Sequence, residues 1–155
     1  EKEIDLDALL AIEWCWENVK RKDFFEMSIK FCNPNTVPAP AAGYSNLAII
    51  PANRRLLVLA GQIGNVMNGE ILNGVEAQYH QALDNINSIV ISEGGTIRDI
   101  AWITIFLTEK ADNALIKKSN KQYFSEQPPA MSWIYVSELF HPDVKVEIEA
   151  IAAVD

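Results

Sequence analysis

Two carboxylates near the carboxyl end of the sequence have the residue type and spacing for proton chemistry. In "VKVEIEAIAAV", Glu147 and Glu149 alternate with apolar residues, so a strand here places both carboxylates on one face. Burying an unpaired carboxylate costs several kcal/mol. The two side chains therefore either pair with Lys145, Arg54 or Arg55, or lie exposed at a sheet edge. The functional alternative is a carboxylate that lines a cleft, where it handles a proton or orients water.

The other residue types that commonly carry chemistry do not form a known arrangement. His80 falls in a helical pattern and His141 in the turn "FHPD", without the paired spacing of a metal site. The segment "AGQIGNVMNG" lacks the lysine of a phosphate-binding loop, and no GxSxG or Cys–His signature supports nucleophilic catalysis. We therefore expect neither a metal site nor a phosphate loop.

The stretch "QPPAMSWIYV" places Met131 at a loop-to-strand junction. Polar groups that hold small metabolites often lie at such junctions, whereas methionine carries only a thioether. Pro128 and Pro129 restrict the chain before it, and the residues after it read as a buried strand. Met131 and Trp133 should share one face of that strand, because its side chains alternate with a period of two. Taken alone, Met131 is interpreted as core packing.

Composition limits the class of protein. With 155 residues, of which 49% are hydrophobic and 22% charged, the chain fits one globular domain. The net charge of −8 argues against a nucleic-acid partner, because phosphate binding needs clustered basic residues. The nearest basic cluster, Lys20, Arg21 and Lys22, is short and flanked by acidic residues. No apolar run approaches the ~20 residues of a membrane span, so we expect no membrane partner.

Cysteine usage and the start of the sequence bear on the compartment. Cys15 and Cys32 form no CxxC pair, so we expect no disulfide framework and a reducing, cytoplasmic location. The acidic start "EKEIDLDALL" lacks the basic segment with which a signal peptide begins.

The hydrophobic periodicity predicts the elements that must position these residues. We expect helices over 4–20, 74–95 and 110–124, and strands over 26–31, 44–50, 56–63, 97–108, 130–139 and 144–154. The strand over 56–63 is apolar on both faces, which predicts a central position. The order implies an α+β sandwich with two helices on one face of a sheet. Because the other face also needs cover, we expect a homo-oligomer with clefts between its subunits.

The run from Asn33 to Val154 resembles the Rid/YjgF family, the reactive intermediate deaminases, also called L-PSP or perchloric-acid-soluble proteins. The matching pieces are "NPNTVPAPAAGYSNLAI", "LAGQIG", "NGEILNGVEAQYHQALDNINSIVISEGG", "DIAWITIFLT", "YF…PPA" and "VEIEAIA". They occur in the order of the family, and the tryptophan-containing start lies outside them. The resemblance thus divides the chain into an N-terminal helical extension over 1–26 and a Rid/YjgF-like domain over 27–155.

The resemblance implies a chorismate-mutase-like α+β fold with a six-stranded, mostly antiparallel sheet, assembled as a homotrimer with intersubunit clefts. It also implies hydrolysis of enamines or imines, such as 2-aminoacrylate, to a keto acid and ammonia without a cofactor. In deaminating members an Arg after "PPA" grips the substrate carboxylate, a Glu positions the attacking water and a Tyr lines the pocket. By this resemblance Glu147 and Tyr44 are the catalytic candidates, and Gly61, Gln62 and Ala130 are substrate-binding candidates.

The sequence departs from the family pattern at four positions that would contact a substrate. Met131 stands where deaminating members have Arg, and a thioether cannot neutralise a carboxylate. Trp133 replaces a small Cys, Ala60 replaces Ser, and Lys117 falls where many members have Asn. Losing a charge-assisted hydrogen bond costs roughly 1.5–3 kcal/mol. The departures therefore predict a cleft with altered specificity.

Three functions fit these residues. The first is an enzyme in which Glu147 and Tyr44 act on a less charged or larger imine, enamine or related unsaturated small molecule. The second is a 2-iminobutanoate/2-iminopropanoate-type deaminase, with Lys117, Arg54 or Arg55 in place of the missing Arg. The third is a non-enzymatic small-molecule-binding or interaction protein, in which the side chains of the cleft leave no room for a substrate.

Two further expectations concern RNA and the extension. Ribonuclease activity, sometimes attached to this family name, is poorly supported because the chain is acidic and lacks a basic groove. The extension should dock on its own trimer through its apolar residues, Leu9, Leu10, Trp14 and Trp16.

Overall fold

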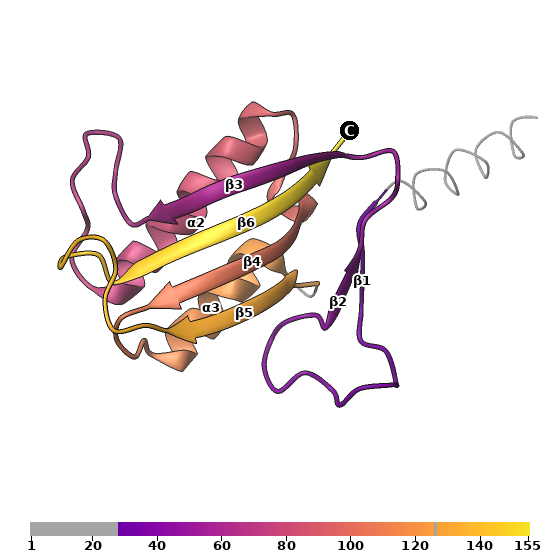
Figure 1. The fold of residues 1–155 in the computed structure, drawn as a ribbon, viewed down its shortest axis with the longest axis horizontal. Coiled ribbons are helices and arrows are strands. Elements are labelled where there is room, and N and C mark those ends of the chain that lie inside the picture. Colours follow the sequence, from indigo (N-terminus) through magenta and orange to yellow (C-terminus); the bar gives the residue numbers. More distant parts are fainter. Residues whose placement is uncertain (1–27, 126) are drawn as a thin grey trace, which may run out of the picture.

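The protein is built on a four-stranded sheet whose one face is covered by two helices (Figure 1). The computed structural model describes residues 28–125 and 127–155. The strands of the sheet, in the order β3–β6–β4–β5, are Arg55–Ile63, Val146–Val154, Ile100–Leu107 and Ala130–Tyr135. Helices α2 (Val75–Ser92) and α3 (Asn113–Phe124) lie behind them, and a short 3-10 turn, η1 (Ile97–Asp99), leads into β4. The predicted α+β order with two helices on one face is confirmed.

Helix α2 forms where the apolar stripe predicts it. Its buried positions recur three and four residues apart and pack on the sheet, which is the pattern of an amphipathic helix. The buried residues are Val75, Gln78, Tyr79, Ala82, Leu83, Ile86 and Val90. Gly94 adopts a φ of +85°, and the N–H groups of Gly94 and Gly95 donate to the carbonyls of Ile91 and Val90. The glycine pair therefore ends the helix, as predicted.

The strand count differs from the predicted six-stranded sheet. Strands β1 (Lys30–Cys32) and β2 (Leu47–Ile49) pair with each other in a separate ribbon beside the sheet (Figure 1). In the described chain, a single bridge between Ser45 and Ala130 connects the segment before β2 to the start of β5. The Ser45 N–H donates to the Pro129 carbonyl (3.1 Å), and its hydroxyl donates to the Pro128 carbonyl (2.7 Å). Since neither proline has an N–H to donate, the pairing does not extend from Ala130 back toward Pro128.

The apolar strand β3 lies at the edge of the sheet, so the prediction of a central position is wrong. Its residues Leu57 and Leu59 face the core beneath α2. Leu56 and Val58 point to the opposite side and are 56% and 81% exposed, and Trp102 of β4 is exposed on the same side. The pattern of β3 thus reflects an apolar sheet face that no described helix covers. We call this surface the open face.

The helix predicted over 4–20, with its docking residues, lies outside the described residues, as does the beginning of the strand predicted over 26–31. Among the described residues, no helix is long and apolar enough to cross a bilayer.

Candidate functional site

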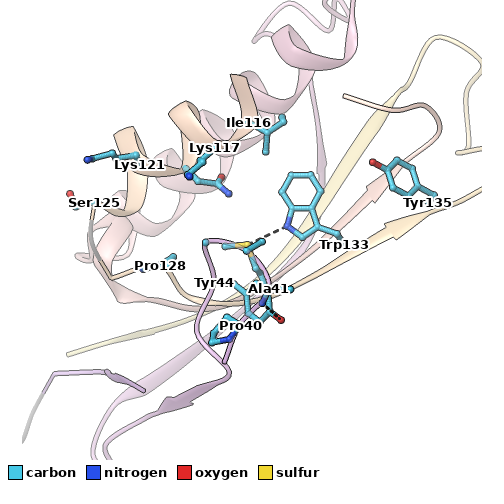
Figure 2. A pocket seen from close by; sticks show the side chains of 14 residues that line it. Pro40, Ala41, Tyr44, Ile116, Lys117, Lys121, Ser125, Pro128, Trp133 and Tyr135 are labelled. Carbon is cyan, nitrogen blue, oxygen red and sulfur yellow. Dashed lines mark hydrogen bonds between the residues drawn. The ribbon is translucent and has the colours of Figure 1, made fainter. Parts of the chain in front are cut away.

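A cavity of about 1060 Å³ opens between α3, β5 and the loop before β2 (Figure 2). Residues Met131, Trp133 and Tyr135 of β5 form one wall, and Ile116, Lys117, Asn120 and Lys121 of α3 form the facing wall. The loop over 40–44 closes a third side. The strand and helix walls belong to the helix-covered side of the sheet, because Met131 and Trp133 are in register with the buried residues Ile103 and Ile105 of β4.

Met131 and Trp133 contact each other, which confirms that they share a face. The indole N–H of Trp133 donates to the Met131 sulfur at 3.3 Å. The indole ring also stacks on Tyr79, which is fully buried in α2, with ring centroids 5.7 Å apart and an interplanar angle of 22°. Met131 is therefore more than core packing, because it supplies the hydrogen-bond acceptor of a half-buried tryptophan that lines the cavity.

Tyr44 reaches the cavity from the loop before β2. Its hydroxyl accepts a hydrogen bond from the Ala41 N–H at 3.4 Å, within the same loop. The following residue, Ser45, anchors that loop to Pro128 and Pro129 through the two bonds described above. The proline pair thus holds Tyr44 and Met131 on neighbouring walls of one cavity.

The cavity carries positive charge in an acidic protein. Lys117 and Lys121 both line it, and no described Asp or Glu side chain does. Of the three cations proposed to replace the missing Arg, only Lys117 lines the cavity. Arg54 pairs with Asp99 (3.0 Å) and Arg55 with Glu93 (2.6 Å), both away from the cavity.

Glu147 lies on the other side of the sheet. It is in register with Ile63 of β3 and Phe106 of β4, and its carboxylate rests on Gly61, where a Cβ would overlap Oε1. A register shift between Leu59 and Gln62 marks this point of the ladder as irregular. One chain therefore does not bring Glu147 together with Tyr44.

The remaining predicted site residues do not line the cavity. Ala60 is exposed on the open face, and the Gln62 amide donates to the Ala60 carbonyl at 3.1 Å. Ala130 is half-buried at the start of β5, opposite Trp102, and does not line the cavity. Glu149 shares the open face and is exposed. Among the described residues of one chain, neither Glu147 nor Glu149 forms an ion pair, so the alternative of pairing with Lys145, Arg54 or Arg55 does not apply. Their strand β6 is also central, so their exposure comes from the uncovered face rather than from an edge.

A set of side-chain hydrogen bonds that the sequence did not predict joins α2 to α3 behind the cavity. The hydroxyl of Tyr79 donates to Asn120 Oδ1 (2.5 Å), and that of Tyr123 donates to Asp84 (2.6 Å). Ser119 Oγ lies 2.7 Å from His80 Nε2. The only signal in the sequence is the run of polar residues on the inner side of a short helix.

Burial keeps both tyrosines neutral. Burial, and secondarily the neighbouring Tyr123, raises the pKa of Tyr79 well above its usual range. Burial and the hydrogen bond to Asp84 raise the pKa of Tyr123 in the same direction. The described residues contain no group of three or more His, Cys, Asp or Glu side chains arranged to hold a metal.

Known proteins resemble this chain in sequence. A family model described as "Endoribonuclease L-PSP" matches residues 35–154. A RutC family protein of Pyrococcus horikoshii is 38% identical over 117 residues, which are 74% of this chain and 90% of the relative. A 2-iminobutanoate/2-iminopropanoate deaminase of Escherichia coli is 38% identical over 101 residues, 63% of this chain and 78% of the relative.

Solved structures resemble it in fold. A protein of the Rid family from Yersinia pestis superposes with a TM-score of 0.72 at 28% identity, over 83% of this chain and all of the other. Escherichia coli TdcF with bound serine superposes with a TM-score of 0.59 at 32% identity, over 81% and 99% of the two chains. Sequence and fold agree, and the chain belongs to the Rid/YjgF family, the L-PSP proteins.

Proposed function

We propose that this protein is a cofactor-independent hydrolase of an imine, enamine or related unsaturated small molecule, with a specificity altered by Met131 and Trp133. The observation that carries the proposal is the division of the candidate residues between two faces. Tyr44 and the cavity lie on the helix-covered side, and Glu147 rests on Gly61 on the open face. A second copy of the chain, docked by its open face, would complete the site.

The chemistry of such a shared cleft is simple. Glu147 of one copy accepts a proton from water as the water oxygen adds to the imine carbon, and it returns that proton to the nitrogen to give a carbinolamine. The hydroxyl proton of this adduct then moves to the amine, the C–N bond breaks, and ammonia and the carbonyl product leave. Tyr44 of the other copy lines the site beside the reacting carbon. A homotrimer satisfies both needs, because a closed ring of heterologous contacts covers every open face and creates equal clefts.

The matched pair of variants Glu147→Gln and Glu149→Gln tests the proposal. The two residues share a strand and a face, but only Glu147 contacts Gly61. Turnover of the imine or enamine that the native protein hydrolyses should fall by at least ~100-fold in Glu147→Gln, as expected for loss of a general base. Glu149→Gln should retain it, with assembly intact in both variants. Unchanged turnover in Glu147→Gln would remove the proposed role.

A second candidate is deamination of 2-imino acids, the activity named for the Escherichia coli relative. The observation in its favour is Lys117, which lines the cavity and could replace the missing Arg. Adding this protein to enzymatically generated 2-iminopropanoate should then accelerate release of the keto acid. No acceleration at high protein concentration would reject this candidate.

A non-enzymatic role and a ribonuclease activity have less support. A non-enzymatic role predicted a cleft filled by Met131 and Trp133, whereas a cavity of about 1060 Å³ lies beside them. Although the family model carries the word endoribonuclease, the net charge of −8 disfavours an RNA substrate.

A further inference from the structure

The charges and rings that line the cavity define its ligand more closely than an imine. We propose that the cavity binds a carboxylate whose body is a flat aromatic ring. Lys117 holds the carboxylate, and Trp133 holds the ring. The inference rests on the proposed function for the reacting group, and it names the substrate class as unsaturated amino-acid derivatives with an aromatic side chain.

Lys117 binds the carboxylate. Figure 2 shows it on the helix wall, across from Trp133 on the strand wall. Since no described carboxylate of the same chain lines the cavity, the ammonium group of Lys117 favours an anion there. Compared with the family pattern, a positive charge is absent at Met131 on the strand and present at Lys117 on the helix. The group that binds the carboxylate therefore lies on the helix wall instead of the strand wall.

The strand wall suits a ring. Tyr79 covers one face of the Trp133 indole, and the Met131 sulfur binds the indole N–H. Because Trp133 lines the cavity, its remaining surface is a flat apolar platform that is held in place before a ligand arrives. Aromatic rings pack on such platforms in offset or edge-on arrangements. Ile116 on α3 adds apolar surface on the facing wall.

The arrangement of the two walls separates this ligand from a small imino acid. A ring-bearing acid packs its ring on Trp133 of the strand wall and reaches Lys117 of the facing helix wall with its carboxylate. A two- or three-carbon acid has no ring to pack on Trp133.

Binding of inert analogues to the protein of 155 residues tests the proposal by calorimetry. The probe is 3-phenylpropionate, compared with propionate, which lacks the ring, and 3-phenylpropanamide, which lacks the charge. We expect 3-phenylpropionate to bind at least ~10-fold more tightly than either, because one charge-assisted hydrogen bond alone gives about this factor. Equal affinity for any two of the three would overturn the proposal. Tighter binding of phenyl phosphate would overturn the assignment of a carboxylate.

A pair of neighbouring lysines provides the matched variants. Lys117→Gln should weaken binding of 3-phenylpropionate about tenfold and leave binding of the amide unchanged. Lys118 is exposed on the same helix but does not line the cavity, so Lys118→Gln should bind like the native protein. An equal loss of affinity in both variants would show that binding depends only on the net charge of the protein, and it would contradict the role of Lys117.

The same measurements in Glu147→Gln separate this inference from the proposed function. Binding of 3-phenylpropionate should survive in that variant even though turnover is lost. If turnover persists in Glu147→Gln while binding depends on Lys117, the proposed function fails and the ligand class stands. If turnover is lost but the ring and charge have no effect on affinity, the ligand class fails and the proposed function stands.

Discussion

The contact between Met131 and Trp133 couples two departures from the family pattern. An Arg at position 131 would present donors to the indole N–H, whereas the methionine sulfur accepts its hydrogen bond. A Cys at position 133 would leave the space that the indole fills against Tyr79. A methionine at position 131 and a tryptophan at position 133 therefore suit each other, since each contacts the other in the wall of the cavity.

Replacing the sulfur tests this coupling. Met131→Leu conserves volume but removes the acceptor of the half-buried indole N–H, so we expect a loss of about 0.5–1.5 kcal/mol in the free energy of unfolding. Met67→Leu is the control, because Met67 is fully exposed in a loop and should show no loss. Denaturant titration gives both values, and equal stability of the two variants would argue that the sulfur contact contributes nothing.

Two glycines beside β3 should respond differently to alanine. A Cβ at Gly61 overlaps only the Glu147 side chain, from Cγ to Oε1, whereas a Cβ at Gly64 overlaps the backbone of Gln78 in α2. Gly61→Ala should therefore fold normally and lose about 100-fold in turnover, since a displacement of ~1 Å at a catalytic group has that effect. Gly64→Ala should lose at least about 1–3 kcal/mol of stability. Thermal unfolding and turnover of both variants check the contrast, and an active Gly61→Ala would contradict the role of Glu147.

At the scale of elements, α2 and α3 are joined by tyrosines that ionise with difficulty. Because the folded state raises the pKa of Tyr79, the unfolded chain releases that proton more easily. The stabilisation is therefore complete below the ordinary tyrosine pKa of about 10 and is lost as the pH rises above it.

We expect stability to fall more steeply above pH ~10 in the native protein than in Tyr79→Phe, by up to about 1.4 kcal/mol per pH unit. Tyr135→Phe is the control, since Tyr135 is exposed and belongs to neither helix. Urea titrations across this pH range give the slopes. Identical slopes for all three proteins would mean that Tyr79 ionises as readily folded as unfolded.

The sequence predicts α2 well because its signals are local. The stripe from Val75 to Val90 and the stop at Gly94 depend on residues within a few turns of each other. The edge position of β3 could not be predicted, because a two-sided apolar pattern is the same whether a neighbouring strand or an uncovered face accounts for it.

The candidate site shows the same limit. The period of two correctly groups Met131 with Trp133, and Glu147 with Glu149. The side of the sheet on which each pair lies depends on the register among β4, β5 and β6. That register joins residues far apart in the sequence, so no local pattern specifies that the two pairs lie on opposite faces.

For the whole molecule, this division makes a prediction that a single-chain site does not. If each cleft combines the cavity of one copy with Glu147 of another, two inactive variants should rescue each other when mixed. Tyr44→Ala lacks a cavity residue but keeps Glu147, and Glu147→Gln keeps the cavity. After the two are unfolded and refolded together in equal amounts, about a quarter of the clefts in a cyclic assembly should contain both native residues.

The recovered turnover should therefore approach about a quarter of the native value, against almost none for either variant refolded alone. Rescue requires association through the open face, so adding Val58→Lys to both variants should abolish it by placing a charge on that apolar surface. Val37→Lys is the matched control, because Val37 is an exposed valine in the loop between β1 and β2. A mixture as inactive as its components, at a concentration where sedimentation shows mixed assemblies, would mean that Glu147 and the cavity do not act in one cleft.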